Sequence, residues 1–339
     1  MKKKVAVLGA TGMVGQRFVS LLNEHPYFEV TSLYASKNSA GKKYKDAVNW
    51  VIEPPIPSYA KDVVLKSFDE RVEEDIVFSA LPKEVADTLE IDLAKEGKFV
   101  FSNTASHRFD PFVPILIPEV NPHHIEAVKY QKTEGFIITN ANCSTTGLVI
   151  PLKALMEKFT VKSVFVVTMQ AISGAGINGL SALLIQGNVL PYIEKEEEKI
   201  ESETRKILGE FKDGFILKSL PVFARANRVP VREGHTEVVF VETDADCEDA
   251  KLAFKNFVGI PQEISLPTAP EKPILLHEEM FRPQPVLDVN SGKGMSVSVG
   301  RIRKNNGFLT FTLLSHNTIR GAAGGSVLNA EFALKEGFI

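Results

Sequence analysis

The chain has 339 residues, a formal net charge of −3 and a pI of about 6.2. This length is enough for two domains with a core each, and the small net charge gives no electrostatic reason to expect a nucleic acid or an anionic membrane as a partner. No apolar run approaches the ~20 residues of a membrane-spanning helix. The lysine-rich start leads into a strand pattern rather than a signal peptide, and the two cysteines lie in unlike contexts. We therefore expect a cytoplasmic protein without disulfides, and we assign no metal site.

The first apolar run, residues 5–8, is followed at once by Gly9-Ala-Thr-Gly12-Met-Val-Gly15 and then by a helical pattern. A strand, a glycine turn and a helix in this order are typical of a phosphate-binding loop. The spacing is G-x-x-G-x-x-G rather than G-x-G-x-x-G, so a plain turn that opens a helix is the alternative. If a dinucleotide binds here, we expect it to contact Gly9, Thr11, Gly12, Met13 and Val14.

A second strand, residues 30–35, ends in the polar loop Ser36-Lys37-Asn38-Ser39. NAD enzymes usually carry an acidic residue at this place, which accepts a bond from the ribose 2′-hydroxyl. The loop has hydroxyls, an amide and a lysine instead, and these groups suit a 2′-phosphate. A solvated polar loop is the alternative, but the position relative to the glycine turn favours an NADP contact by all four residues.

Strands at residues 75–79 and 98–102, with helical character at 84–94 between them, predict a doubly wound parallel sheet. Ligands of such sheets lie beyond the carboxyl ends of the strands. The loops after these two strands should therefore line the cofactor crevice, with contacts from Ser79, Leu81 and Thr104. Arg108 follows in the second loop and is a candidate anion ligand near Cys143.

Cys143 lies between a short apolar strand, residues 135–139, and a helical pattern at 148–159. A helix start offers free N–H groups and the positive end of the helix dipole, which favour a thiolate, and the thiolate is the nucleophile. Asn142 could supply a side-chain donor to a developing oxyanion. A buried structural cysteine is the alternative. Pro151 should kink this helix or end its first segment.

The pattern changes after this helix. Residues 161–170 are expected to form a strand. The strands at 236–242, 296–303 and 308–314 alternate apolar and polar residues, as one-sided antiparallel strands do. Residues 195–208 form a charge-rich helix, for which a solvated face is the alternative, and 319–335 form a small-residue helix. We expect an NADP-binding domain at 1–140 plus 318–339, with Asn317 near the cofactor, and a catalytic α+β domain at 141–317.

Five motifs occur in one order along nearly the whole chain, and together they resemble the aspartate-β-semialdehyde dehydrogenase family, particularly its archaeal and fungal branch. They are Gly9-Ala-Thr-Gly-Met-Val-Gly15, Ala141-Asn-Cys143-Ser-Thr, Gln170-Ala-Ile-Ser-Gly-Ala-Gly176, Arg228-Val-Pro-Val-Arg-Glu-Gly-His235-Thr-Glu and Arg320-Gly-Ala-Ala-Gly324. The sequence departs from the family at Ala141, where proline is frequent, and at Gln186, where glutamate is common.

The resemblance implies a fold and a reaction. The fold is a Rossmann-like α/β domain followed by an α+β domain with a mixed or antiparallel sheet. The reaction is the NADP-dependent reversible conversion of L-aspartyl 4-phosphate into L-aspartate 4-semialdehyde through a cysteine thioester, in the biosynthesis of lysine, methionine, threonine and isoleucine. The exposed strands expected in the second domain predict a homodimer or a homotetramer.

The resemblance also implies a role for each matched residue. Cys143 corresponds to the nucleophile, His235 to the acid/base and Gln170 to the residue that orients the aldehyde. The remaining matches are Glu203 for the substrate amino group, Arg228 for its carboxylate, Lys206 and Arg108 for phosphate, and Ser173 and Gly174 for the cofactor. Because Arg228 and His235 are separated by an odd number of positions, a turn at Pro230 or Gly234 must re-aim one of them.

Three other functions use some of the same residues. A malonyl-CoA or succinyl-CoA reductase shares the cysteine chemistry, but its substrate has no amino group for Glu203. N-acetyl-glutamyl-phosphate reductase and glyceraldehyde-phosphate dehydrogenase fit the residues around Cys143 less well. A non-catalytic NADP sensor belongs to a different class, and rapid labelling of Cys143 by iodoacetamide with loss of NADPH production would exclude it.

Overall fold

The structure, a computed structural model, describes residues 1–339. The chain divides into two compact units. Unit 1 comprises Met1–Leu116, His124–Asn140 and Ala322–Ile339, and unit 2 comprises Ile117–His123 and Ala141–Gly321. The expected boundaries differ from these in two places, because residues 117–123 group with unit 2 and the return to unit 1 comes after Gly321. None of the helices combines the length and the apolar content that a bilayer crossing requires.

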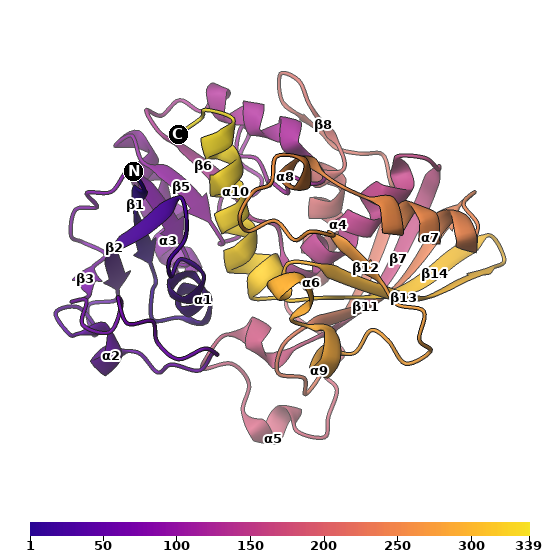
Figure 1. Ribbon diagram of the computed structural model, residues 1–339, viewed down its shortest axis with the longest axis horizontal. Helices are drawn as coiled ribbons and strands as arrows, with labels where there is room; N and C mark the ends of the chain where they lie inside the picture. The colour runs from indigo at the N-terminus through magenta and orange to yellow at the C-terminus, as the bar shows by residue number, and fades with distance from the viewer. The chain divides into compact units, whose positions relative to one another are not determined.

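Unit 1 is built on a six-stranded sheet in the order β3-β2-β1-β4-β5-β6, with every neighbouring pair parallel (Figure 1). This is the strand order of a dinucleotide-binding doubly wound fold, and the predicted parallel sheet is confirmed. Its strands are β1 (Lys3–Leu8), β2 (Phe28–Ala35), β3 (Lys66–Ser67), β4 (Ile76–Ser79), β5 (Phe99–Ser102) and β6 (Phe136–Thr139). Its helices are α1 (Met13–Leu21), α2 (Tyr44–Ala47), α3 (Lys83–Lys95) and α10 (Gly324–Lys335).

Helices cover both faces of this sheet because successive side chains of a strand point to opposite sides. On β4, Val77 packs in a cluster with Leu93 of α3. Its neighbour Phe78 lies on the other face, where its ring is 5.0 Å from that of Phe18 on α1. Helix α10 packs against α1 and β5. The buried strands therefore read as continuous apolar runs, which is the pattern that the sequence displays.

Unit 2 is built on a mixed six-stranded sheet in the order β10-β7-β11-β14-β13-β12, beside a small β8-β9 ribbon. The predicted second α+β domain is confirmed. Its strands are β7 (Val161–Gln170), β8 (Glu210–Phe211), β9 (Phe215–Ile216), β10 (Val222–Arg228), β11 (His235–Thr243), β12 (Ile274–Leu276), β13 (Val297–Asn305) and β14 (Phe308–Ser315). Its helices are α4 (Cys143–Met156), α5 (Ala182–Ile185), α6 (Glu196–Ile207), α7 (Cys247–Asn256), α8 (Ile260–Glu263) and α9 (Pro285–Asp288).

The two faces of the unit 2 sheet differ. Helix α4 packs against β7, β11 and β14, and α6 packs against β10 and α4 (Figure 1). On the opposite face Phe165, Val167, Phe223 and Phe240 are between 39% and 52% exposed. Alternation along β7, β10 and β11 thus places one set of side chains under the helices and leaves an apolar set open.

Two sequence predictions about helices are corrected. Of the two predicted effects of Pro151, a helix end is excluded because α4 runs from Cys143 to Met156, and a kink stays a prediction. A proline costs a helix one backbone bond, and the buried setting of α4 outweighs that loss. The predicted single helix at 319–335 is instead one π-helical turn, Ile319–Ala323, followed by α10, because Ala322 has non-helical dihedral angles (φ −151°, ψ −106°).

Candidate active site

The glycine turn of unit 1 joins β1 to α1 with free N–H groups at the helix start. Gly9 has φ +78°, and a Cβ there would lie 2.3 Å from the Ala80 carbonyl oxygen. A Cβ at Gly15 would lie 2.1 Å from the Gly9 oxygen, so α1 packs directly on the turn. The N-cap, Gly12, offers no capping side chain, and the first turn has no acidic residue. These N–H groups are therefore available to an anion. Thr11, Met13 and Val14 beside them are partly exposed.

The loop after β2 is accessible, with Ser36, Lys37 and Asn38 exposed and Ser39 partly exposed. Sequence reasoning missed one feature here. Lys37 Nζ lies 2.8 Å from Asp69 Oδ2, and both side chains are largely exposed. Asp69 comes just after β3, whose Ser67 pairs with Ala35 at the end of β2. The pairing of two strands distant in the sequence thus brings a carboxylate to the lysine.

The carboxyl ends of β4 and β5 are joined by a buried glutamate. Ser79 Oγ donates to Glu90 Oε1 at 2.5 Å, and Ser102 Oγ donates to the same oxygen at 2.8 Å. Thr104 Oγ1 is buried 3.0 Å from Ser102 Oγ, and Leu81 is 7% exposed. Because Ser79 is fully buried, its hydroxyl is not free to contact a cofactor. A cofactor contact through the backbone of Ser79 stays a prediction.

Cys143 is the first residue of α4, and its sulfur lies 3.2 Å from His235 Nε2. Asn142 caps the helix, since its Oδ1 accepts from the backbone N–H groups of Ser144 at 3.0 Å and Thr145 at 3.1 Å. The first turn contains no acidic side chain. Cys143 is partly exposed and has no disulfide, as expected. This setting favours a reactive thiol over a structural cysteine.

The hydrogen bonds of His235 define which nitrogen carries the proton. Its Nδ1 accepts from the backbone N–H of Ala171 at 3.1 Å. A neutral imidazole with Nδ1 as acceptor carries its hydrogen on Nε2, which faces the sulfur of Cys143. Burial, followed by the charge of Arg228, lowers the pKa of His235 to about 3. The ring is therefore a neutral hydrogen-bond donor toward Cys143.

The same residue, Ala171, also holds Arg228. Its carbonyl oxygen accepts from Arg228 Nη1 at 2.8 Å. Arg228 ends β10 and is in register with Gln170, which ends β7. The chain then reverses and enters β11 at His235 through Gly234, which has φ +94°. The predicted re-aiming turn is thus present. Burial lowers the pKa of Arg228, while Cys143 and a nearby carboxylate raise it.

Helix α6 contributes charged groups from its buried side, so its solvated-face alternative is wrong for these positions. Glu203 is 1% exposed, and its Oε2 accepts from the backbone N–H of Asn142 at 2.6 Å. Lys206 is 2% exposed, and its Nζ lies 4.0 Å from the centre of the Phe215 ring.

Sequence reasoning missed Glu196 and Gly321. Glu196 Oε1 accepts from Asn142 Nδ2 at 2.8 Å and from Gln170 Nε2 at 3.0 Å. The signal was its helical spacing, since Glu196 lies two turns before Glu203 and shares its face. Gly321 lies against the nucleophile, where a Cβ would be 2.7 Å from that of Cys143. The sequence displayed Gly321 within a glycine-rich motif but not its contact.

The predicted cofactor-binding residues of unit 2 form hydrogen bonds that connect the loops around His235. Asn317 Nδ2 donates to Ser173 Oγ at 2.8 Å, and its Oδ1 accepts from the Gly234 N–H at 2.9 Å. Gly174 N donates to the Ala171 oxygen at 3.1 Å. Arg108 belongs to unit 1, where its Nε donates to the Asn140 oxygen at 2.9 Å.

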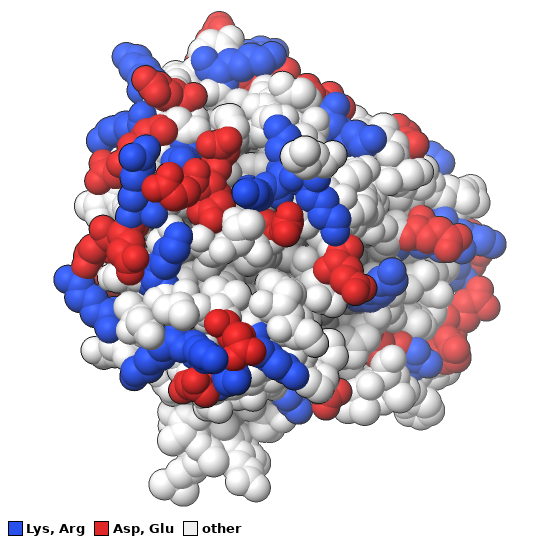
Figure 2. All heavy atoms as spheres, turned by 60° about the vertical axis from the view of Figure 1, so that its left-hand side comes forward, with Lys and Arg blue, Asp and Glu red and all other residues white.

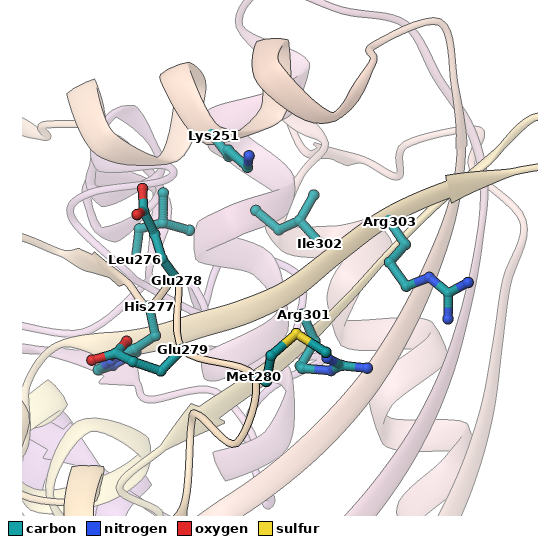
Figure 3. A pocket seen from close by; sticks show the side chains of 9 residues that line it. All are labelled: Lys251, Leu276, His277, Glu278, Glu279, Met280, Arg301, Ile302 and Arg303. Carbon is teal, nitrogen blue, oxygen red and sulfur yellow. The ribbon is translucent and has the colours of Figure 1, made fainter.

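A cavity of about 490 Å³ lies elsewhere in unit 2, lined by α7, the segment after β12, and β13 (Figure 3). Its charged side chains have both signs, among them Lys251, Glu278 and Arg303. It contains none of the predicted site residues, so the thiol and imidazole pair, not cavity volume, identifies the candidate site. On the molecular face shown in Figure 2, basic and acidic side chains are likewise intermingled.

Comparisons with known proteins cover the whole chain. The model of the semialdehyde dehydrogenase NAD-binding domain matches residues 4–128, and that of the semialdehyde dehydrogenase dimerisation domain matches residues 152–320. The aspartate-semialdehyde dehydrogenase of Archaeoglobus fulgidus is 47% identical over 100% of both chains. That of Schizosaccharomyces pombe is 44% identical over 99% of both.

Solved structures give the same result. Aspartate semialdehyde dehydrogenase with NADP from Candida albicans superposes with a TM-score of 0.92, at 40% identity and 100% coverage of both chains. Aspartate semialdehyde dehydrogenase II complexed with ASA from Vibrio cholerae gives a TM-score of 0.82, at 27% identity and 99% coverage. The resemblance drawn from five ordered motifs is confirmed: the chain belongs to the aspartate-semialdehyde dehydrogenase family.

Proposed function

We propose that the protein is an oxidoreductase that interconverts L-aspartyl 4-phosphate and L-aspartate 4-semialdehyde, with NADP and inorganic phosphate, in the aspartate pathway of amino-acid biosynthesis. The observation that carries the proposal is the thiol of Cys143, 3.2 Å from the buried imidazole of His235 at a helix start. A thiolate is the nucleophile that acyl transfer through a thioester requires, and the family membership supplies the substrate.

The residues of unit 1 fit a dinucleotide phosphate cofactor. The uncapped N-terminus of α1 offers the N–H groups of Met13 and Val14 to the pyrophosphate, while those of Gly9 and Gly12 donate to backbone oxygens and shape the turn. The exposed loop from Ser36 to Ser39 offers hydroxyls, an amide and an ammonium to a 2′-phosphate. When bound, NADP would supply the acceptor for the hydride of the substrate carbon, and its reduced form the hydride donor of the biosynthetic direction. Ser173, Gly174 and Asn317 are proposed to contact the same cofactor.

The chemistry on the chain begins with the bond from Cys143 Sγ to the aldehyde carbon. The aldehyde oxygen then becomes an oxyanion, and His235 Nε2–H is placed to donate to it. The sequence predicted an acid/base, but Nδ1 is engaged by Ala171, so we assign the imidazole the role of neutral donor. Loss of hydride leaves a thioester. A phosphate oxygen attacks the thioester carbon, the C–S bond breaks, and Cys143 returns as a thiolate.

We propose that the carboxylate, ammonium and phosphate groups of the substrates bind side chains of opposite charge. Arg228 can hold a carboxylate with its planar fork. Glu203 carries the opposite charge for the ammonium group, and Lys206 supplies positive charge for phosphate. The resemblance alone assigns Arg108 of unit 1 to the same anion. Gln170 and Asn142 direct amide N–H groups to Glu196. That bond uses one of the two N–H groups of Asn142 Nδ2, and we propose the other for the aldehyde oxygen. Gln170 Nε2 donates a second bond to Thr168 Oγ1 at 3.3 Å, which holds its amide in place.

An activity assay with matched cysteine variants tests the proposal. We expect NADPH formation from aspartate semialdehyde, NADP and phosphate, and a loss of at least ~1000-fold in Cys143→Ser because serine is far less nucleophilic at neutral pH. Cys247, on α7, is the matched control, and Cys247→Ser should keep wild-type activity. Equal behaviour of the two variants, or no turnover by the wild type, would contradict the proposal.

The assembly and the location are also proposals. The open apolar face of the unit 2 sheet supports a homodimer or a homotetramer, because contiguous exposed apolar side chains mark interaction surfaces. Two free cysteines support a reducing, cytoplasmic location. We propose unit 1 as the NADP-binding domain and unit 2 as the catalytic and oligomerisation domain.

A further inference from the structure

Asn142, the residue before the nucleophile, is held at three points. Its Oδ1 accepts from the first turn of α4, its backbone N–H donates to Glu203 Oε2 at 2.6 Å, and its Nδ2 donates to Glu196 Oε1 at 2.8 Å. Two of these three points come from α6. The start of α4, and with it Cys143, is therefore fixed from a second helix rather than by its own cap alone.

Glu196 stands at the centre of this arrangement. It is 6% exposed, and its Oε1 accepts from the amides of both Asn142 and Gln170. Its other oxygen lies 3.6 Å from Lys199 Nζ. Gln170 immediately precedes Ala171, whose backbone binds His235 and Arg228. One oxygen atom thus connects the segment that carries the nucleophile to the segment that holds the imidazole.

We propose that Glu196 is a positioning residue for the thioester chemistry, an inference that rests on the proposed function: its Oε1 fixes the amides of Asn142 and Gln170 and so holds Cys143 beside His235. Glu196 has no contact with Cys143 or His235 among its hydrogen bonds. Its effect passes through the two amides, and its removal should alter the rate of reaction more than the binding of substrate.

The contribution of the acceptor can be separated from that of the charge. Because both amides donate to the same oxygen, Glu196→Gln keeps an oxygen acceptor and loses only the negative charge. Glu196→Met fills a similar volume with no such acceptor, and Glu196→Ala removes the side chain. In the last two variants two buried N–H donors lose their partner. Asn142 is then held only by its other two bonds, and the Gln170 amide keeps its bond to Thr168 Oγ1.

The experiment measures turnover and the alkylation rate of Cys143 in all three variants. We expect Glu196→Met and Glu196→Ala to lose roughly 100-fold in kcat with KM changed less than about threefold, as misplacement of a reacting group does. The rate at which iodoacetamide alkylates Cys143 should change by at least about fivefold, in either direction, because the thiol no longer has a fixed position. Glu196→Gln should stay within about fivefold of the wild type in both measurements.

Glu198 on the exposed side of the same helix is the matched control, and Glu198→Ala should change neither measurement. Circular dichroism establishes that each variant is folded, and Glu196→Met provides the reading if Glu196→Ala does not fold. Wild-type rates in Glu196→Met would overturn the proposal. Equal losses in Glu196→Gln and Glu196→Met would also overturn it, because the charge and not the acceptor would then matter. The alkylation rates test the positioning even if the proposed substrate is not turned over.

Discussion

At the scale of residues, the backbone of one residue, Ala171, determines the character of the candidate site. The N–H of Ala171 donates to His235 Nδ1, and its carbonyl oxygen accepts from Arg228 Nη1. The first bond selects the tautomer with hydrogen on Nε2, and the second places a positive charge near the ring. In a protonated imidazole, the N–H at Nδ1 would face the N–H of Ala171, and the positive ring would lie near the positive charge of Arg228. The site therefore favours a neutral histidine.

His235 should stay neutral across the physiological range, because burial and Arg228 lower its pKa to about 3. Imidazole nitrogen chemical shifts of labelled protein should assign the hydrogen to Nε2 and should not titrate between about pH 5 and 8. The unfolded chain binds this proton near pH 6.5, so the histidine makes stability fall as the pH drops from there toward about 3. A titration midpoint near the ordinary value would contradict the donor role.

At the scale of elements, the periodicity of a helix and that of a strand both place ionisable side chains in the buried interior of unit 2. Glu196 and Glu203 share the buried face of α6 through helical spacing. His235 and Glu237 share the buried face of β11 through strand alternation. Sequence patterns alone make both elements look half solvated, and the packing of α4 and α6 on the sheet removes the water.

Glu237 should make the protein less stable as the pH rises. It is fully buried, neither carboxyl oxygen has a hydrogen-bond partner, and burial followed by Glu196 raises its pKa well above the ordinary 4.5. The folded state keeps the proton of the Glu237 carboxyl group, while the unfolded state loses it. The free energy of unfolding of Glu237→Gln, relative to that of the wild type, should therefore grow by ~1.4 kcal/mol per pH unit above about pH 5. Urea unfolding at pH 5 and pH 8 measures this, with Glu198→Gln as the control. Parallel changes in all three proteins would refute it.

The loop after β2 should determine the choice of cofactor. Ser36→Asp places a carboxylate where a 2′-phosphate is proposed to bind, which repels the phosphate and offers an acceptor to a ribose hydroxyl. The ratio of kcat/KM for NADP to that for NAD should fall by at least about tenfold. Ser58→Asp, at an exposed position outside this loop, is the control. An unchanged ratio in Ser36→Asp would place the 2′-phosphate elsewhere.

At the scale of the whole molecule, one surface exposes several large apolar side chains. Phe223 on β10 is 52% exposed, and its ring stacks on that of Phe165 at 4.8 Å between centroids. Val167 and Phe240 continue this patch on the open face of the unit 2 sheet. We propose a second copy of the chain, with the same patch, as the partner of this surface.

Light scattering should show the protein as a dimer or a tetramer, and Phe223→Asp should lower the assembly state because it places a charge in a desolvated apolar contact. Val64→Asp, at a position in unit 1 that is 55% exposed, should leave the mass unchanged. A monomeric wild type, or an unaffected mass in Phe223→Asp, would exclude this surface as the interface.

The sequence by itself determined the elements, the class of both sheets and the family, because periodicity, glycine turns and motif order are local properties of the chain. The sequence motifs also identify both Cys143 and His235 as site residues. Only the tertiary structure decided the tautomer of His235, the pairing of Lys37 with Asp69, the burial of Ser79 and the place of Glu196 between Asn142 and Gln170. Each of these depends on a contact between segments far apart in the chain, and no local pattern encodes which buried donor meets which acceptor.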